Sequence, residues 1–178
     1  RFAELLPGIL CTAGTAEATL LSESSVDLIT AAQAFHWFDE EKFKSEAKRI
    51  LRPNGKVAII WNTSLKNAFT IARDEICKKY CPRFRSGHAG KRTPAEGDNF
   101  LRYIYFQKVE FVSFANPFEM TPDIFEGNMR SRSYMPAPGD DTFEACMEEL
   151  RSVFDRFATC GKVTEEVETQ IFLGEFTP

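Results

Sequence analysis

Three side chains that could act in catalysis or binding lie in or just after predicted secondary-structure elements. His36 comes shortly after an apolar run at Val26–Thr30. An imidazole in that place could take a proton as a general base, and the equally weighted alternative is a helix-start residue with a satisfied hydrogen bond. Arg130 and Arg132 precede Tyr134. A guanidinium group can hold a carboxylate through two parallel hydrogen bonds, so this second cluster favours an acidic ligand.

The stretch Val26–Asn62 must position His36, and it is predicted to fold as a strand, a helix and a second strand. Asp39 is a good N-cap, and Pro53–Gly55 is typical of a helix end followed by a turn. Val57–Trp61 then forms a second buried strand, which completes a right-handed βαβ unit. Small residues at the carboxyl end of the first strand would let a ligand approach the backbone, and they are Ala31, Ala32 and Ala34.

The rest of the chain alternates between helical and strand-like patterns. The last strand is expected to run antiparallel at the far edge of the sheet. The long helix before it is predicted to start at an Asp141–Glu144 capping box and to close at Gly161. The other predicted elements are helices over Lys66–Tyr80, Asn99–Phe106 and from Thr121 onward, and strands at Ile9–Thr12, Lys108–Phe114 and Glu166–Phe172.

Composition excludes several classes of protein. The 178 residues are 43% hydrophobic and 27% charged, which is typical of one globular domain. A net charge of −4 argues against nucleic acid as a partner, and no run is long and apolar enough for a membrane span. The spacing of the five cysteines fits no zinc pattern, so no metal is predicted. Cys77 and Cys81, one helical turn apart, could share a bond or a metal, but reduced thiols of a cytoplasmic protein are favoured.

Two segments resemble a known family. The run DLITAAQAFHWFD followed by KRILRPNGKVAIIWN resembles the fourth strand, the following helix and the fifth strand of class I S-adenosylmethionine-dependent methyltransferases. Within them, the chain is most similar to methyltransferase type 11 and the trans-aconitate-methyltransferase-like group, because SRSYMPAPGD resembles the substrate-side segment of that group. The resemblance is strong over Gly14–Asn62 and Ser131–Asp140 and loose between them.

The resemblance implies an α/β fold with a Rossmann-like sheet of strand order 3-2-1-4-5-7-6 and an antiparallel last strand. The family's glycine-rich GxGxG loop is absent from this sequence, so strands 1 and 2 are expected to be missing. We therefore expect residues 1–178 to be the C-terminal two-thirds of a single methyltransferase-like domain, with a helical and loop cap on the substrate side around residues 81–140. The Val26–Thr30 strand would then be an exposed edge, open to a homodimer or to a complementing chain.

The implied activity is methyl transfer from S-adenosyl-L-methionine to a small-molecule acceptor, for which the arginines favour a carboxylic acid. The alternative is a non-catalytic module that lacks cofactor binding and acts in dimerisation or regulation. Thr15 stands where the family usually carries the acid that meets the adenine. The resemblance makes His36 catalytic. It implies cofactor contacts from Thr15, Ala16, Glu17, Ala32, Gln33, Ala34 and Trp37, and substrate contacts from Asn62, Arg130, Arg132 and Tyr134.

Overall fold

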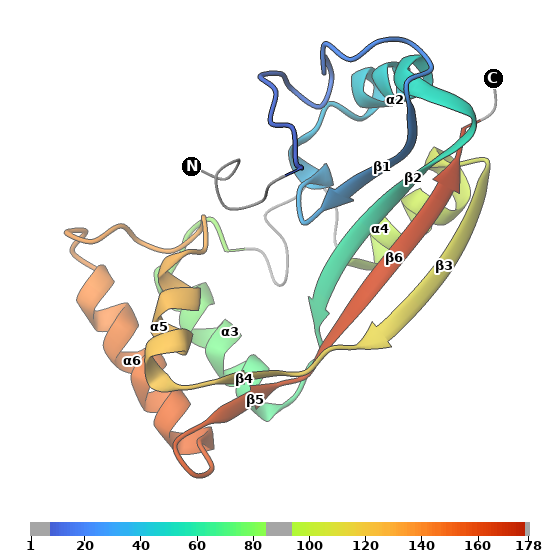
Figure 1. The fold of residues 1–178 in the computed structure, drawn as a ribbon. Helices are drawn as coiled ribbons and strands as arrows, with labels where there is room; N and C mark the ends of the chain where they lie inside the picture. The colour runs from blue at the N-terminus through green and yellow to red at the C-terminus, as the bar shows by residue number, and fades with distance from the viewer. Residues whose placement is uncertain (1–7, 85–93, 177–178) are drawn as a thin grey trace.

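A computed structural model describes residues 8–84 and 94–176, and Figure 1 shows that they form two lobes. One lobe is a sheet with helices on one face, and the other is mostly helical. Each lobe has its own hydrophobic core, and the two cores have no described residue in common. In the described ranges, extended segments cross between the lobes after β2, after β3 and before β6.

The sheet lobe contains the predicted strand–helix–strand unit, which the structure confirms. Its strands lie in the order β1-β2-β6-β3. This agrees with the last four positions of the expected order, and the Rossmann-like α/β fold is confirmed. The elements of this lobe are β1 (Val26–Ala32), the 3₁₀ turn η1 (Phe35–Trp37), α2 (Glu40–Ile50), β2 (Leu51–Ser64), α4 (Pro94–Phe100), the π-helical turn η2 (Leu101–Tyr105), β3 (Lys108–Ala115) and β6 (Val167–Glu175).

The strand pairing confirms one expectation about the sheet and corrects another. β1 runs parallel to β2, whereas β6 is antiparallel to both β2 and β3. The antiparallel last strand is therefore confirmed. The prediction that it lies at the far edge is wrong, because β3 pairs on its outer side and forms that edge. Among the described strands β1 has a neighbour on one side only, so it is the exposed edge that was predicted.

The helical lobe extends beyond the predicted cap at residues 81–140. Residues 85–93 of that range lie outside the described residues, and β3 within it belongs to the sheet. The elements of this lobe are α3 (Ala68–Tyr80), β4 (Phe118–Met120), α5 (Pro122–Arg130), α6 (Phe143–Phe157) and β5 (Val163–Glu165). Phe125 and Met129 of α5 pack against Met147 and Leu150 of α6 in one core, so helices on both sides of the predicted cap stabilise it.

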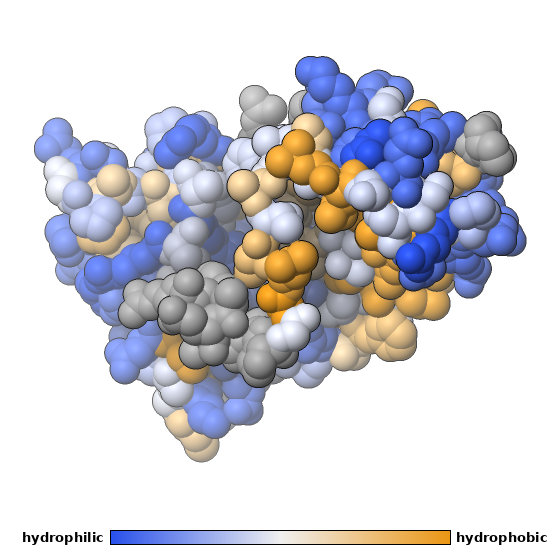
Figure 2. Space-filling model, turned by 45° about the horizontal axis from the view of Figure 1, so that its top comes forward, coloured by the Kyte–Doolittle hydropathy of each residue, from blue (hydrophilic) through white to orange (hydrophobic). Residues whose placement is uncertain are grey.

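One face of the sheet is covered by helices, and the other is open in the described part of the chain. Val57, Ile59 and Phe172 face α2 and η2 and are almost completely buried. Side chains alternate between the faces of a strand. The opposite face therefore carries Leu28 and Val112, which are 53% and 47% exposed. Figure 2 shows hydrophobic residues gathered over the middle of the molecule and the sheet lobe, with a more hydrophilic helical lobe.

Two predicted local features are confirmed. Asp39 caps α2, since its side chain accepts a hydrogen bond from the Lys42 backbone N–H at 3.2 Å. The Pro53–Gly55 turn is present, and it forms a bulge inside β2 where the pairing jumps from Leu51 to Lys56. Asn54 has a φ of +67°, a left-handed conformation that asparagine tolerates better than most residues.

Several predicted boundaries are wrong. Residues 9–12 are irregular and exposed, because no described strand lies beside them to complete a ladder. The Asp141–Glu144 capping box is absent: α6 has Thr142 at its N-cap, without a side-chain cap bond. The helix ends at Phe157, and Gly161 lies in the turn that follows. The helix expected at residues 99–106 starts earlier, at Pro94, and ends in the π turn η2.

The longest described helix, α6, has 15 residues. None of the described helices has the length and apolar character that crossing a membrane requires.

Candidate functional site

The turn after β1 holds His36 through a buried aromatic anchor. Phe35 is 4% exposed. Its ring packs edge-on against Phe43 of α2 and Tyr105 of η2, with centroids 5.9 and 5.1 Å away. Because Phe35 occupies the core, the next two side chains project from it. His36 is half-buried, and Trp37 is 63% exposed and available for contact.

His36 lies against aromatic rings from two elements. Its imidazole is 5.5 Å from the Trp61 ring of β2 in a stacked arrangement, with 29° between the planes. It also lies 4.7 Å from the ring of its neighbour Trp37, tilted by 48°. Trp61 was predicted only as part of a buried strand. The regular alternation of a strand gave no signal that its indole would lie beside the histidine.

The carboxyl ends of β1 and β2 meet next to this stack. The backbone N–H of Gln33 donates to Ile60 O at 3.0 Å, and the Gln33 side-chain amide donates to Asn62 O at 3.3 Å. The side-chain oxygen of Asn62 accepts from the Thr169 hydroxyl at 2.8 Å. Gln33 adopts a φ of +52°. The structure therefore brings Ala32–Ala34, His36 and Asn62 together at one end of the sheet, as the sequence predicts.

The Thr15–Glu17 turn is attached to the same region through its acid. A Glu17 carboxylate oxygen accepts the backbone N–H of Asp39 at 2.9 Å, at the start of α2. This hydrogen bond is the main cause of the lowered pKa of Glu17, and the Thr15 hydroxyl also contributes. Glu17 therefore fastens the turn to α2, while Thr15 stays exposed. Of the two side chains, Thr15 is the more accessible to a ligand.

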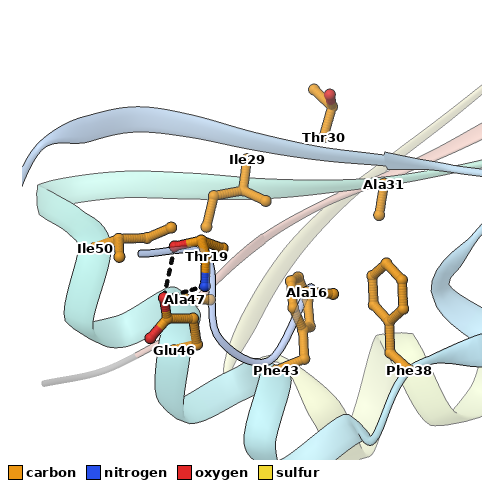
Figure 3. A pocket seen from close by; sticks show the side chains of 10 residues that line it. All are labelled: Ala16, Thr19, Ile29, Thr30, Ala31, Phe38, Phe43, Glu46, Ala47 and Ile50. Atoms are coloured by element: carbon orange, nitrogen blue, oxygen red, sulfur yellow. Dashed lines mark hydrogen bonds between the residues drawn. The ribbon is translucent and has the colours of Figure 1, made fainter. Parts of the chain in front are cut away.

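A pocket of about 160 Å³ lies between this turn, β1 and α2. Figure 3 shows Phe38 and Phe43 on its α2 side and Ala31 on its β1 side. Its one acid, Glu46, is occupied: it accepts the Thr19 backbone N–H at 2.9 Å and pairs with Arg49 at 2.8 Å. The hydrogen bonds from Arg49 and Thr19 lower the pKa of Glu46 to about 2. The rest of the lining is mostly apolar.

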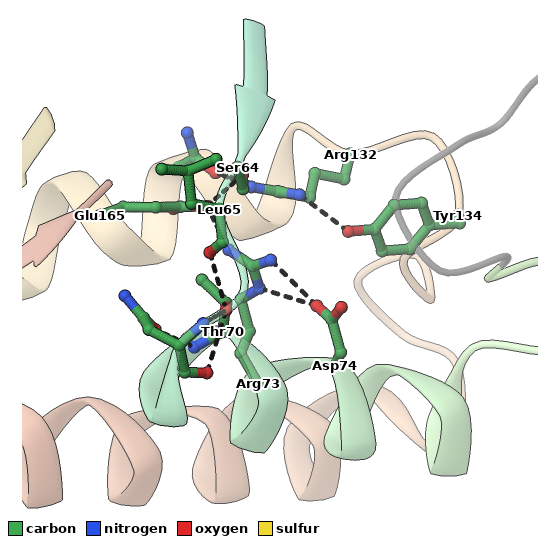
Figure 4. A network of polar contacts seen from close by, with 10 residues as sticks. Ser64, Leu65, Thr70, Arg73, Asp74, Arg132, Tyr134 and Glu165 are labelled. Carbon is green, nitrogen blue, oxygen red and sulfur yellow. Dashed lines mark hydrogen bonds and ion pairs between the residues drawn. The ribbon is translucent and has the colours of Figure 1, made fainter. Parts of the chain in front are cut away.

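A second polar cluster lies where β2 enters the helical lobe (Figure 4). Arg73 of α3 and Glu165 of β5 are each 4% exposed, and their guanidinium and carboxylate groups lie 2.6 Å apart. The same carboxylate accepts the hydroxyl of Ser64, the last residue of β2, and Arg73 also pairs with Asp74 at 2.9 Å. Burial opposes the charge on Arg73, but Glu165 and Asp74 outweigh it and raise the pKa of Arg73.

Arg132 and Tyr134 belong to this cluster, whereas Arg130 does not. Arg132 donates to Asn128 Oδ1 at 2.9 Å and to the Tyr134 hydroxyl at 3.0 Å, so both partners are neutral. Within the described residues Arg132 forms no ion pair. Burial raises the pKa of Tyr134 to about 12, so the hydroxyl keeps its proton at neutral pH. Arg130 instead pairs with Glu126 at 3.1 Å.

The described cysteines are all reduced, and three of them are buried together in the helical lobe. Cys81 lies 3.6 Å from the sulfur of Met135, and burial raises the pKa of Cys77 and Cys81 to about 12. Such thiols stay protonated and unreactive. No cluster of three or more His, Cys, Asp or Glu side chains in the described ranges is arranged to hold a metal ion.

Sequence comparison finds methyltransferases. A family model described as "Methyltransferase domain" matches residues 3–59. An uncharacterized methyltransferase-like protein of Schizosaccharomyces pombe is 30% identical, and the match covers 97% of this chain and 67% of that protein. An uncharacterized methyltransferase of Mycobacterium tuberculosis is 43% identical over 58 residues, which is 33% of this chain and 24% of that protein.

Comparison with solved structures gives the same fold. A protein of Anaeromyxobacter dehalogenans, provisionally classed as a type II methyltransferase, superposes with a TM-score of 0.65 at 22% identity. The superposition covers 97% of this chain and 74% of that one. A provisionally classed methyltransferase of an antibiotic pathway in Anabaena variabilis superposes with a TM-score of 0.58 at 16% identity, covering 93% of this chain and 74% of that one.

Proposed function

Since the chain belongs to the class I S-adenosylmethionine-dependent methyltransferases, we propose that it takes part in methyl transfer from this cofactor to a small-molecule acceptor. The observation that carries the proposal is the meeting of Ala32–Ala34, His36 and Asn62 at the carboxyl ends of two parallel strands. In open α/β sheets this is the end at which ligands bind. The family relation favours this function over a non-catalytic module.

The residues present fit the adenosine and methyl side of the cofactor. Small side chains at Ala32 and Ala34, with the left-handed Gln33 between them, leave the backbone accessible. Thr15 is exposed and its hydroxyl can accept a hydrogen bond, although more weakly than a carboxylate. The exposed indole of Trp37 supplies an apolar wall. Thr15, Ala16, Ala32–Ala34 and Trp37 are the proposed contacts, while Glu17 holds the turn in place.

S-adenosylmethionine supplies a methyl group that is already activated on a sulfonium sulfur. The protein then has to align the acceptor, exclude water and, for some acceptors, remove a proton. His36 is the proposed proton acceptor, because its ring is held beside the strand ends by Trp61 and Trp37. Acceptors that are already ionised need no base, and for these His36 only shapes the wall.

A carboxylic acid is the proposed acceptor class, and Arg132 is the proposed anion-binding residue. Its hydrogen-bond partners Asn128 and Tyr134 are neutral, so its charge is balanced by no direct ion pair among the described residues. The charge still acts at longer range, since it helps to lower the pKa of Glu165. Arg130 is the weaker candidate because Glu126 already pairs with it. Ser64 belongs to the polar cluster that contains Arg132, and Trp61 contacts His36. These two residues lie three positions apart on β2, which corresponds to about 10 Å along a strand.

Calorimetric titration with S-adenosylhomocysteine tests the proposed cofactor site. We expect binding at one site per chain, and we expect Trp37→Ala to weaken it by several-fold because the exposed indole wall is removed. Tyr103→Ala removes a ring that is 77% exposed on η2 and should leave the affinity unchanged. If the unmodified chain showed no heat of binding, the described residues would not form a cofactor site by themselves.

The two arginines provide a matched test of the acceptor class. With trans-aconitate and other di- and tricarboxylic acids as acceptors, Arg132→Gln should raise KM by about tenfold or more, because loss of a charge-assisted bidentate contact costs about 1.5–3 kcal/mol. Arg130→Gln should leave KM unchanged. Tritiated S-adenosylmethionine provides the assay. Equal effects of the two substitutions would contradict the assignment of Arg132.

A further inference from the structure

The chain has two tryptophans, and both touch His36 from different elements. Trp37 is the next residue along the same 3₁₀ turn, so it moves whenever the turn moves. Trp61 is 25 positions away on β2. A contact between the histidine and that strand fixes the imidazole relative to the sheet, which a contact within the turn cannot do.

β2 is the rigid partner in this contact. It pairs with β1 on one side and with β6 on the other, and Trp61 itself lies opposite Gln170 of β6. The turn is weaker: η1 is three residues long, and its N-cap, Ala34, makes no side-chain cap bond. A residue in the middle of a sheet therefore supports a side chain on a short turn.

The stacked geometry restricts the histidine ring. The second side-chain torsion of histidine has a broad preference, so an isolated imidazole turns easily. The Trp61 ring, with its centroid 5.5 Å from that of the imidazole and its plane at 29° to it, favours one orientation of the imidazole. In that orientation the imidazole contacts both Trp37 and Trp61, near the strand ends where Gln33 meets Asn62.

We infer that Trp61 is a positioning residue for His36: it holds the imidazole in the orientation from which it meets the methyl acceptor. The inference rests on the proposed function. The proposed carboxylate acceptor needs no base, so the role of the imidazole here is to align the acceptor with the methyl group. A misplacement of about 1 Å can cost a hundredfold in rate even when the misplaced group takes no part in the chemistry. Loss of the Trp61 ring should therefore lower kcat while leaving acceptor binding nearly intact.

The stack itself is tested by NMR on the full chain, without any ligand. The sequence has two histidines, His36 and His88, so a His88→Gln variant assigns the imidazole signals. We expect the Trp61 ring current to shift the His36 signals, and Trp61→Leu to remove that shift. Trp61→Phe should keep part of it. If Trp61→Leu does not fold, Trp61→Met replaces it, and the remaining spectrum reports the fold.

The catalytic consequence is tested with tritiated S-adenosylmethionine and a panel of small carboxylic acids. We expect Trp61→Leu to lower kcat by about 10- to 100-fold with KM within about threefold, and Trp61→Phe to restore most of the rate. Tyr103→Leu, at an exposed aromatic position away from the stack, should change neither constant.

The two measurements separate this inference from the proposed function. The positioning role would be overturned if Trp61→Leu left the chemical shift of the His36 imidazole unchanged. It would also be overturned if the shift changed and kcat did not. Failure of the unmodified chain to bind S-adenosylhomocysteine and to methylate any acid would instead overturn the proposed function, and the positioning role with it. Loss of the ring-current shift of His36 together with a lowered kcat in Trp61→Leu, and recovery of both in Trp61→Phe, would support the positioning role and the proposed function.

Discussion

At the scale of single residues, the Arg73–Glu165 ion pair holds two elements of the helical lobe together at the point where β2 enters that lobe. It links α3 to the end of β5, and Ser64 adds the end of β2 to the same carboxylate. Both charged groups are almost completely buried. Removing one partner of such a pair leaves an uncompensated charge in a poorly solvated place, which costs more than the pair itself contributes.

We expect Glu165→Gln to destabilise the protein by about 3–5 kcal/mol, because Arg73 would keep its charge without its main partner. Urea denaturation measures the change. Lys162→Ala is the matched control, because it removes the ion pair between Lys162 and Glu119. These two side chains are 52% and 63% exposed, and exposed ion pairs contribute about 0–1 kcal/mol. If both variants lost a similar amount of unfolding free energy, the buried ion pair would contribute no more to stability than an exposed one.

The same pair makes stability depend on pH. Burial alone would raise the pKa of Glu165, but Arg73, the Ser64 hydroxyl and Arg132 lower it below its ordinary value of 4.5. A carboxyl whose pKa is lower in the folded state contributes stability above its unfolded pKa and loses it as the pH falls through the folded value. Unfolding free energy should therefore drop below about pH 4.5, with a smaller slope in Glu165→Gln.

Residue patterns predicted part of the site. The sequence predicted that His36 and Asn62 lie near the carboxyl ends of neighbouring parallel strands, and the structure has them there. Their roles come from the family resemblance and stay predictions. The sequence did not separate Arg130 from Arg132, because it did not show that α5 ends at Arg130 and leaves Arg132 in the turn that follows. Neither Arg73 nor Trp61 was expected in its role, because each depends on a partner far along the chain.

At the scale of elements, β6 and the end of η2 approach each other at a glycine. A Cβ atom added to Gly174 would lie 2.1–2.4 Å from atoms of the Phe106 ring. Phe106 is buried in the core of the sheet lobe, where its ring packs edge-on against Tyr105 and at a tilt against Phe176. The absence of a side chain at Gly174 therefore sets how closely the turn after α4 lies on the sheet.

Gly174→Ala should destabilise the protein by about 1–3 kcal/mol, because Phe106 must leave its position to make room. Gly127→Ala in α5 is the control: its Cβ would meet nothing within 4 Å, and alanine favours a helix over glycine by up to about 1 kcal/mol. Chemical denaturation of both variants, with Phe106→Leu added to Gly174→Ala, checks the contact. No recovery in the double variant would rule out Phe106 as the cause.

Local signals predicted the elements better than their ends. The Asp39 cap and the Pro53–Gly55 turn were predicted because each depends on its immediate neighbours. The Asp141–Glu144 box failed since α6 begins at Phe143, a start set by packing of Phe143 and Met147 in the lobe core. The order of β6 and β3 depends on contacts between distant segments. It was expected from the family resemblance alone, since alternation along one strand carries no information about it.

At the scale of the whole molecule, we propose association through β1, whose edge is open and whose neighbouring face is uncovered among the residues that the structure describes. Unpaired strand edges accept strands from other chains. The expected partner is a second copy of this chain or a complementing chain, and this stays a proposal. Leu28 lies on the edge strand and is 53% exposed, so it belongs to both surfaces.

Sedimentation velocity over a range of concentrations tests this proposal. We expect the unmodified chain to associate as its concentration rises, and Leu28→Lys to keep it monomeric, because a lysine on an edge strand opposes pairing. Leu20→Lys makes the same chemical change at a residue that is 81% exposed outside the strands, and should have no effect. A monomer at all concentrations would contradict association through β1.

The separation of the two hydrophobic cores has a consequence for how such a protein can evolve. Substitutions that reshape the helical lobe, where Arg132 and Tyr134 lie, leave the packing under β1 and β2 untouched, because the cores have no described residue in common. With the proposed acceptor contacts in the helical lobe, substitutions there could change the acceptor while the strand ends of the other lobe keep their geometry. Changes of substrate in this architecture should accumulate in α3, α5 and α6 before they reach the sheet.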